Sequence, residues 1–205
     1  MSRKAGTVSD ETRARLLLAA TEEFAANGYR GTTLRQICDT AGVTTGAVYF
    51  FFENKEDLFH AVVSPVTDQL PVVMRRHYED CRARMAGGEL AKGDDDLLRG
   101  TMEVLSFYHQ NKQVCDIVLA NRDDPAVEGF FDELSDIIDG QTIWLIEAAG
   151  KSVDEFGIPV IHWYSHIQID AVLYVVSQNL SESEGRAQLK VMVRLIKRGF
   201  HDLFE

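Results

Sequence analysis

Apolar residues recur every three or four positions along most of the chain. The clearest case lies near the N-terminus, where Leu16, Leu17, Ala20 and Phe24 share one face of a helix expected from Asp10 to Asn27. No segment of useful length alternates apolar and polar residues, as a half-buried strand would. The pattern therefore predicts an all-α protein of about nine helices.

Two short helical patterns flank a turn at Ala41-Gly42-Val43. Glycine allows a sharp turn there without a side-chain clash, and Thr44 can cap the second helix. The apolar positions expected to face inward are Leu34, Ile37, Ala41, Val48, Phe51 and Phe52. This arrangement predicts a helix-turn-helix, in which the second helix enters a DNA groove.

The rest of the chain continues the helical pattern, with proline and glycine marking its interruptions. Pro65 and Pro71 predict breaks near Ser64 and Leu70, because proline removes a backbone hydrogen bond inside a helix. The other expected elements are a helix from Asn54 through Met85, a loop at 87–93, and helices at 94–109, 112–121, 125–150, from Pro159 and from Ser181. Met1–Ser9 is expected to be a loose arm, either a disordered terminus or a minor-groove contact.

Composition is that of a soluble globular protein, with 45% hydrophobic and 26% charged residues. No apolar run approaches the roughly 18 residues of a membrane span, and the N-terminus lacks an apolar signal sequence. The three cysteines have neither disulfide nor zinc-site spacing. We therefore expect a reduced, cytoplasmic protein without a membrane partner.

The net charge of −11 would at first argue against a nucleic-acid partner. Residues 1–60 hold 7 Lys and Arg against 8 Asp and Glu, whereas residues 61–205 hold 14 against 24. The acidic excess therefore lies outside the predicted helix-turn-helix. Affinity for phosphate must come from a few placed contacts, so we expect modest non-specific DNA binding.

The helix-turn-helix resembles the DNA-binding domain of the TetR family of bacterial repressors. The matching residues are Ala41-Gly42-Val43-Thr44, Val48-Tyr49, Phe52, Lys55 and Leu58, preceded by Leu16–Ala20, Phe24, Gly28-Tyr29 and Thr32-Thr33. The resemblance covers roughly residues 10–63. It implies a DNA-binding domain over residues 1–54 and a ligand-binding and dimerisation domain over residues 55–205.

By this resemblance, the third helix lies in the major groove of an operator. The residues that would face DNA are Thr44, Thr45, Gly46, Ala47, Tyr49 and Phe50, while Thr33 and Lys55 would hold phosphates. Alternatively, Thr44 only caps the helix and Tyr49 is a surface aromatic.

Two positions depart from the family's usual pattern. Thr45 stands where a basic residue is common, and Phe51 stands where His or Tyr is common. Phe50 is either a contact to a thymine methyl group or simply an exposed aromatic.

One helix-turn-helix buries too little surface to select a genomic site, so two copies on half-sites of a palindromic operator are expected. The last two helices, about 158–204, are more apolar than one core needs and could join two chains. The resemblance implies a four-helix bundle between subunits. The alternative is that both helices are wholly internal.

The resemblance also implies a pocket for a small-molecule effector of unknown identity, with no cofactor required. Residues that could line such a pocket are Met102, Phe107, His109, Trp144 and Tyr174, although ordinary core is the simpler interpretation for each one. Separately, His162, His166 and Asp170 share one helical face and could bind a divalent metal with His109 or another carboxylate. A polar strip at a subunit seam or pocket wall is the alternative.

The sequence thus predicts a ligand-responsive, homodimeric repressor that binds double-stranded DNA and is released by a small molecule. No catalytic motif supports an enzyme. The competing interpretations are an all-α small-molecule-binding protein or enzyme with an incidental helix-turn-helix, and an adaptor that binds proteins through Phe50–Phe52.

Overall fold

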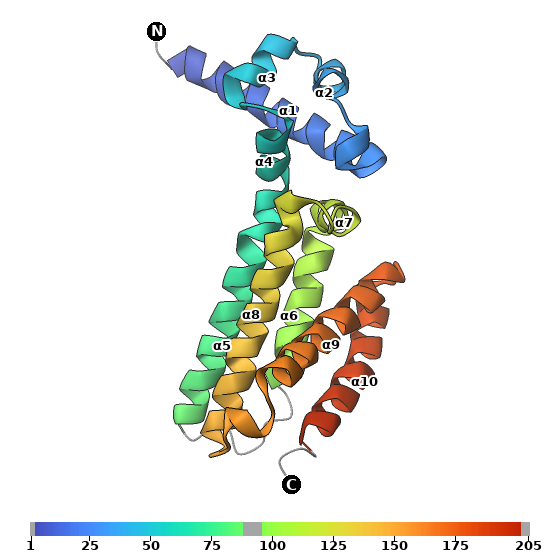
Figure 1. The fold of residues 1–205 in the computed structure, drawn as a ribbon. Helices are drawn as coiled ribbons and strands as arrows, with labels where there is room; N and C mark the ends of the chain where they lie inside the picture. Colours follow the sequence, from blue (N-terminus) through green and yellow to red (C-terminus); the bar gives the residue numbers. More distant parts are fainter. Residues whose placement is uncertain (1–2, 88–95, 202–205) are drawn as a thin grey trace. The chain divides into compact units, whose positions relative to one another are not determined.

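The computed structural model describes residues 3–87 and 96–201, which fold into ten α-helices and one short 3-10 helix. No strand occurs in this part of the chain, so the all-α prediction is confirmed. The chain divides into two compact units, drawn in Figure 1. Unit 1 comprises Met1–Gln69 and Asn111–Gly129, and unit 2 comprises Leu70–Gln110 and Phe130–Glu205.

Unit 1 is built around one long helix. Its elements are α1 (Arg3–Gly31), α2 (Leu34–Ala41), α3 (Thr45–Phe51), α4 (Lys55–Thr67) and α7 (Lys112–Ala120). The helix α1 packs against each of the other four. Leu16, Phe24, Ile37, Val48 and Phe59 are almost fully buried and form the centre of the core.

The helix α1 differs from its expected extent at one end and agrees at the other. Gly28 has φ 69° and ψ 170°, so the helical path is broken at the predicted Asn27-Gly28 end. The expectation of a loose arm over Met1–Ser9 is wrong from Arg3 onwards, because α1 already begins there. That stretch contains no proline to stop the helix from continuing.

Pro65 does not interrupt α4, contrary to the break expected near Ser64. The missing N–H of Pro65 leaves the carbonyl of Ala61 without its helical donor, and the hydroxyl of Ser64 donates to that carbonyl at 3.5 Å. The helix instead ends at Thr67, with Asp68 as its C-cap. This is close to the second break, which was expected near Leu70.

The predicted starts of three helices are confirmed. Asn54 accepts a hydrogen bond from the amide of Asp57 at 2.9 Å. Ser181 and Glu184 form a reciprocal capping box at the start of α10, with bonds of 3.0 and 3.4 Å. The helix α8 begins at Pro125, as the Asp-Pro pair predicts.

Unit 2 contains the remaining helices. These are α5 (Gln69–Ala86), α6 (Asp96–Gln110), α8 (Pro125–Ala148), the 3-10 helix η1 (Val153–Glu155), α9 (Ile158–Ser177) and α10 (Glu182–His201). The first five residues of α8, 125–129, are assigned to unit 1. The helix α10 packs against α6 and α9. Gly185 permits the close approach, since a Cβ there would lie 3.2 Å from Val175 and 3.4 Å from Leu105. Residues 88–93 of the expected loop and residues 202–204 of the last helix lie outside the described residues.

The boundary between the units differs from the one expected at residues 54 and 55. The helix α4 belongs to unit 1 because its apolar face packs on α1 and α7. The ring of Phe59 lies 5.0 Å from that of Phe24 and 4.7 Å from that of Tyr29, measured between centroids. Unit 1 therefore needs α4 and α7 to complete its core.

Among the described helices, none combines the length and the apolar character needed to cross a lipid bilayer.

Candidate nucleic-acid interface

The turn between α2 and α3 is fixed by glycine geometry and by an arginine from α1. Gly42 adopts the left-handed conformation, with φ 63° and ψ 40°. The amide of Val43 donates to the carbonyl of Cys38 at 3.0 Å. The guanidinium of Arg15 donates to the carbonyls of Ala41 and of Gly42, the latter at 3.2 Å. Arg15 thus holds the turn that orients α3, a role that the sequence did not reveal.

The predicted inward and outward faces of α3 are separated as expected. Val48 is fully buried and Phe52 is 3% exposed, whereas Tyr49 is 61% and Phe50 is 75% exposed. Thr44, Thr45 and Gly46 are also exposed, and Ala47 is partly exposed. We call Thr44, Thr45, Gly46, Tyr49 and Phe50 the outer face of α3. Phe52 is buried as expected, whereas Phe51, also expected to face inward, is only half-buried, with its ring centroid 4.9 Å from that of Phe50. Of the three phenylalanines proposed for a protein-binding adaptor, only Phe50 is exposed.

Thr44 occupies the N-cap position of α3 without capping it through its side chain. Its hydroxyl makes no capping hydrogen bond, whereas its carbonyl accepts from the amide of Ala47 at 2.9 Å. The expectation that the Thr44 hydroxyl caps the helix is therefore wrong. The hydroxyl stands at the exposed start of α3, where a hydrogen-bonding partner outside the chain can reach it.

Thr33 caps α2 in a complete capping box. Its hydroxyl accepts from the amide of Gln36 at 3.3 Å and donates to the Gln36 side chain at 2.6 Å. The amide of Thr33 donates to the same side-chain oxygen at 2.8 Å. Contact between Thr33 and a phosphate would require the Gln36 side chain to give up these bonds.

Lys55 is engaged with the backbone of unit 1. Its ammonium donates to the carbonyl of Tyr29 at 2.9 Å and to that of Thr32 at 3.0 Å. It also lies 4.3 Å from the centre of the Tyr29 ring. An ammonium has three N–H donors, so one remains for the predicted phosphate. Arg35, exposed in the first turn of α2, adds a cation that sequence reasoning did not select.

The residues proposed from sequence as pocket-lining lie on three helices, α6, α8 and α9. Met102, Phe107 and His109 lie on α6, and only Phe107 is buried. Trp144 is half-buried on α8 beneath Arg82, whose guanidinium carbon is 5.4 Å from a ring centroid of Trp144. Tyr174 is 56% exposed on α9, which does not fit a place in an enclosed pocket.

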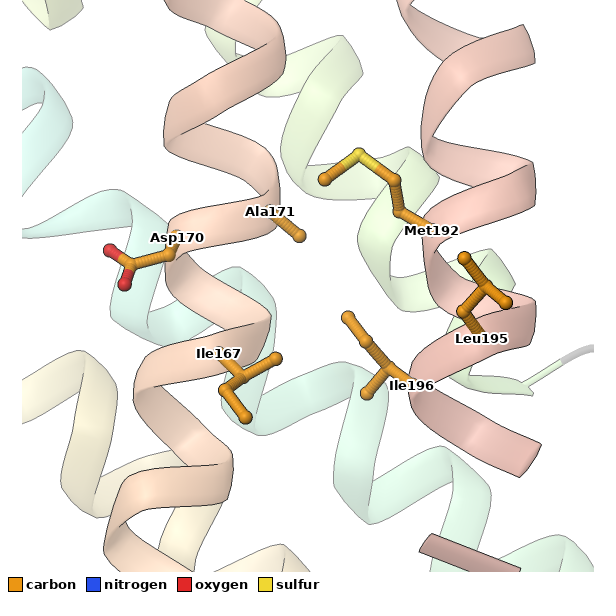
Figure 2. Close-up of a pocket in the computed structure, with 6 residues that line it drawn as sticks. All are labelled: Ile167, Asp170, Ala171, Met192, Leu195 and Ile196. Carbon is orange, nitrogen blue, oxygen red and sulfur yellow. The ribbon is translucent and has the colours of Figure 1, made fainter. Parts of the chain in front are cut away.

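An open groove of about 300 Å³ lies between α9 and α10 (Figure 2). It is open and almost wholly apolar, and its lining residues are Ile167, Asp170, Ala171, Met192, Leu195 and Ile196. Asp170 therefore lies at this groove, whereas His162 pairs with a different carboxylate, that of Asp139, at 2.8 Å. The expected grouping of His162, His166 and Asp170 is thus only partly formed. Within the described residues, no three potential metal-ligating side chains gather at one point.

Comparisons with known proteins match the N-terminal segment specifically. Residues 16–62 match the family model of bacterial regulatory proteins of the tetR family. The HTH-type transcriptional regulator SrpR of Pseudomonas putida is 45% identical over 64 residues, 31% of this chain and 30% of that protein. The HTH-type transcriptional repressor BepR of Brucella suis is 47% identical over 53 residues, 26% of this chain and 25% of that protein. The chain thus matches less than a third of the length of either relative.

Solved structures extend the likeness of fold over most of the chain. SmeT, the repressor of the Stenotrophomonas maltophilia multidrug efflux pump SmeDEF, superposes with a TM-score of 0.64 at 18% identity. That match covers 91% of this chain and 89% of SmeT. FadR of Bacillus subtilis, solved with stearoyl-CoA, gives 0.59 at 17% identity over 89% of this chain and 96% of FadR. The helix-turn-helix geometry and the match over residues 16–62 together show that the N-terminal segment of this chain belongs to the TetR family of bacterial regulatory proteins.

Proposed function

We propose that the protein is a transcriptional regulator that binds a palindromic DNA operator as a homodimer and responds to a small molecule. The observation that carries this proposal is the outer face of α3, which displays hydroxyl and aromatic groups on a helix whose other side is locked into the core. In a helix-turn-helix, the second helix presents such a face to base edges in the major groove. A regulator of this kind would act in the cytoplasm and needs no catalytic residues.

The outer face of α3 favours recognition by shape, hydroxyl contacts and apolar contacts. The segment Thr45–Phe51 contains no charged side chain, so no bidentate arginine contact to guanine can come from it. Exposed aromatics suit the thymine methyl group, and threonine hydroxyls suit base edges or phosphates.

A selection from random-sequence DNA with the full chain tests the proposal. We expect enrichment of an inverted repeat with half-sites roughly 34–36 Å apart, and affinity that falls steeply with salt. Tyr49→Ala should abolish binding to the selected site. Val72→Ala is the matched control, since Val72 is also 61% exposed but lies on α5 in unit 2. Failure to enrich any sequence, or binding by Tyr49→Ala equal to wild type, would overturn the proposal.

The homodimer is proposed to form through α9 and α10, which pack on each other (Figure 1). These two helices leave large apolar side chains exposed: Ile158, Val160, Trp163, Tyr174, Val191 and Leu195. Apolar surface on this scale, beside the apolar groove of Figure 2, is typical of an interface between proteins. An operator with two half-sites is bound by two copies of the chain, so we propose that a second copy covers this apolar surface.

Light scattering after size exclusion tests the dimer. The wild-type chain should elute with twice its mass of 23.0 kDa. Leu195→Arg should dissociate the dimer, because it places a charge on the apolar face. Leu18→Arg is the control: Leu18 is 67% exposed and Leu195 is 69% exposed, but Leu18 lies on α1. A monomeric wild type, or equal effects of the two substitutions, would refute this arrangement.

Response to a small molecule is proposed from the likeness of fold. SmeT has been solved with triclosan and FadR with stearoyl-CoA, and both superpose over most of this chain. The effector of this protein is not specified by that likeness. Screening apolar compounds for release of the selected operator from the full chain would identify it.

A further inference from the structure

Two histidines one turn apart on α9 bring their outer nitrogens together. The Nε2 atoms of His162 and His166 share a hydrogen bond of 3.0 Å, and both residues are exposed. The other ring nitrogen of His162, Nδ1, lies 2.8 Å from a carboxylate oxygen of Asp139 on α8. Asp139, His162 and His166 all belong to unit 2, whereas the helix-turn-helix belongs to unit 1.

Asp139 determines which nitrogen of His162 carries the proton. An ionised carboxylate only accepts hydrogen bonds, so the Nδ1 of His162 must donate to it. In the neutral ring, the lone pair of Nε2 then accepts from the Nε2–H of His166. For both nitrogens to bind one metal ion, His166 must carry its proton on Nδ1 instead. Asp139 is itself held by the hydroxyl of Ser165, a fully buried residue that donates to its other oxygen. A carboxylate that orients a histidine through its second nitrogen is the usual support of a metal-ligating imidazole.

The distance between the two nitrogens allows both to bind one metal ion. With metal–nitrogen bonds of about 2.0–2.1 Å, nitrogens 3.0 Å apart subtend an angle of about 95° at the metal. A tetrahedral ion with the same bonds would need about 3.4 Å. The observed spacing therefore suits adjacent positions of a square-planar or octahedral ion, the geometries of Cu²⁺ and Ni²⁺.

We propose that His162 and His166 form a two-nitrogen chelate for a divalent transition-metal ion of the Cu²⁺ or Ni²⁺ type, with Asp139 orienting His162. The remaining coordination positions go to water. Asp170, expected from sequence as a third ligand, belongs to the α9–α10 groove instead. His109, the other partner considered from the sequence, lies on α6 near Glu182, at the start of α10.

Calorimetric titration of the full chain, purified without a histidine tag, tests the chelate with Ni²⁺ and with Cu²⁺. We expect one ion to bind per chain at micromolar metal concentration, and Mg²⁺ not to bind. His162→Gln and His166→Gln should each abolish this binding. Asp139→Asn should keep the stoichiometry and lower the affinity about tenfold or more, as loss of an orienting carboxylate does. His60→Gln is the control, because His60 is an exposed histidine on α4 in unit 1.

Fluorescence provides a second measurement that does not depend on heat. Trp163 lies between the two histidines in sequence and is 63% exposed, so bound Cu²⁺ should quench its emission. The quenching should disappear in His166→Gln and persist in His60→Gln. Unchanged binding in both histidine variants of α9, equal loss in His60→Gln, or no binding at micromolar metal would overturn the proposal. Operator binding is measured separately, with wild-type protein and without metal. A negative result in the metal titration would therefore leave the proposed regulatory function unaffected.

Discussion

Replacing Lys55 with methionine tests whether this residue is a structural part of unit 1. Methionine keeps most of the aliphatic stem and removes the ammonium. The change deletes two charge-assisted hydrogen bonds, to the carbonyls of Tyr29 and Thr32, and the contact with the Tyr29 ring. All three interactions connect α4 to the end of α1.

The expected loss of stability follows from these contacts. Hydrogen bonds to a charged group contribute about 1.5–3 kcal/mol each, and a cation–π contact about 0.5–1 kcal/mol. Lys55 is only half-buried, so water can replace part of what is lost, and the low end of each range applies. The low ends sum to about 3.5 kcal/mol, so we expect Lys55→Met to lower the free energy of unfolding of unit 1 by about 3–4 kcal/mol.

The two units can be monitored separately during urea unfolding. Both tryptophans of the chain, Trp144 and Trp163, lie in unit 2, so tryptophan fluorescence reports on that unit. Hydrogen exchange of the α1, α2 and α4 amides reports on unit 1. Lys55→Met should accelerate exchange in these helices and leave the fluorescence transition unchanged.

Lys112→Met is the matched control within unit 1. Lys112 is exposed and pairs with Asp116 at 2.6 Å, one helical turn away. An exposed pair of this spacing is worth only about 0.3–0.5 kcal/mol. Equal effects of the two substitutions on exchange would refute the structural role assigned to Lys55.

The salt dependence of DNA binding separates this role from the predicted phosphate contact. If the third N–H of Lys55 holds a phosphate, removing the charge should lower the slope of log affinity against log salt by about one. Weaker binding with an unchanged slope would show that Lys55 acts only by holding α1 and α4 together.

Three further outcomes are expected. Gly42→Ala should destabilise unit 1 by about 1–2 kcal/mol in urea, because it forces a left-handed alanine 3.1 Å from Arg15, whereas Gly140→Ala should stabilise α8 slightly. Burial raises the pKa of Tyr78 from 10.0 to about 12, so the folded state holds that proton more tightly than the unfolded state does. Stability should therefore fall as pH rises from 10.0 through about 12, and urea titrations at pH 9 and 11 should show a smaller fall in Tyr78→Phe. Replacing thymine by uracil in the selected operator should weaken wild-type binding but not that of Phe50→Ala if Phe50 contacts the methyl group.

Helical periodicity was sufficient to predict which side of α3 is buried. Val48 and Phe52 lie four positions apart and turn inward, while Tyr49 and Phe50 turn outward. This inference needs only the order of apolar and polar residues along one helix. The starts of α4 and α10 were predictable for the same reason, since a cap and its partner lie within a single turn.

Periodicity could not predict which helix a buried face meets. Met102 and Trp144 both show the spacing of inward-facing residues, but each is only half-buried, on α6 and α8 respectively. Tyr174 lies on a helix that is apolar on more than one face and is 56% exposed, so hydrophobicity alone gave no indication of its position. A pocket depends on the mutual placement of several helices, which no single-helix pattern specifies.

The contacts that position the helix-turn-helix could not be predicted from the sequence for a different reason. Arg15 and Lys55 both donate to main-chain carbonyls 23 to 27 residues away along the chain, and every residue possesses such a carbonyl. The sequence therefore identifies the donor but gives no sign of its acceptor. Tyr29 shows this most clearly: its carbonyl accepts from Lys55 of α4, and its amide donates to the Asn121 side chain, beside α7, at 3.1 Å.

The bonds at Tyr29 also explain why unit 1 extends beyond the segment that matches the family model. Gly28 turns the chain out of the helical path, which exposes the amide and carbonyl of the next residue to partners outside α1. Lys55 and Asn121 satisfy those two groups from separate parts of the sequence. A fragment that ended at residue 62 would keep Lys55 but lose Asn121 and the apolar face of α7. Such a fragment should therefore fold less stably than the full chain, even though it contains the entire helix-turn-helix.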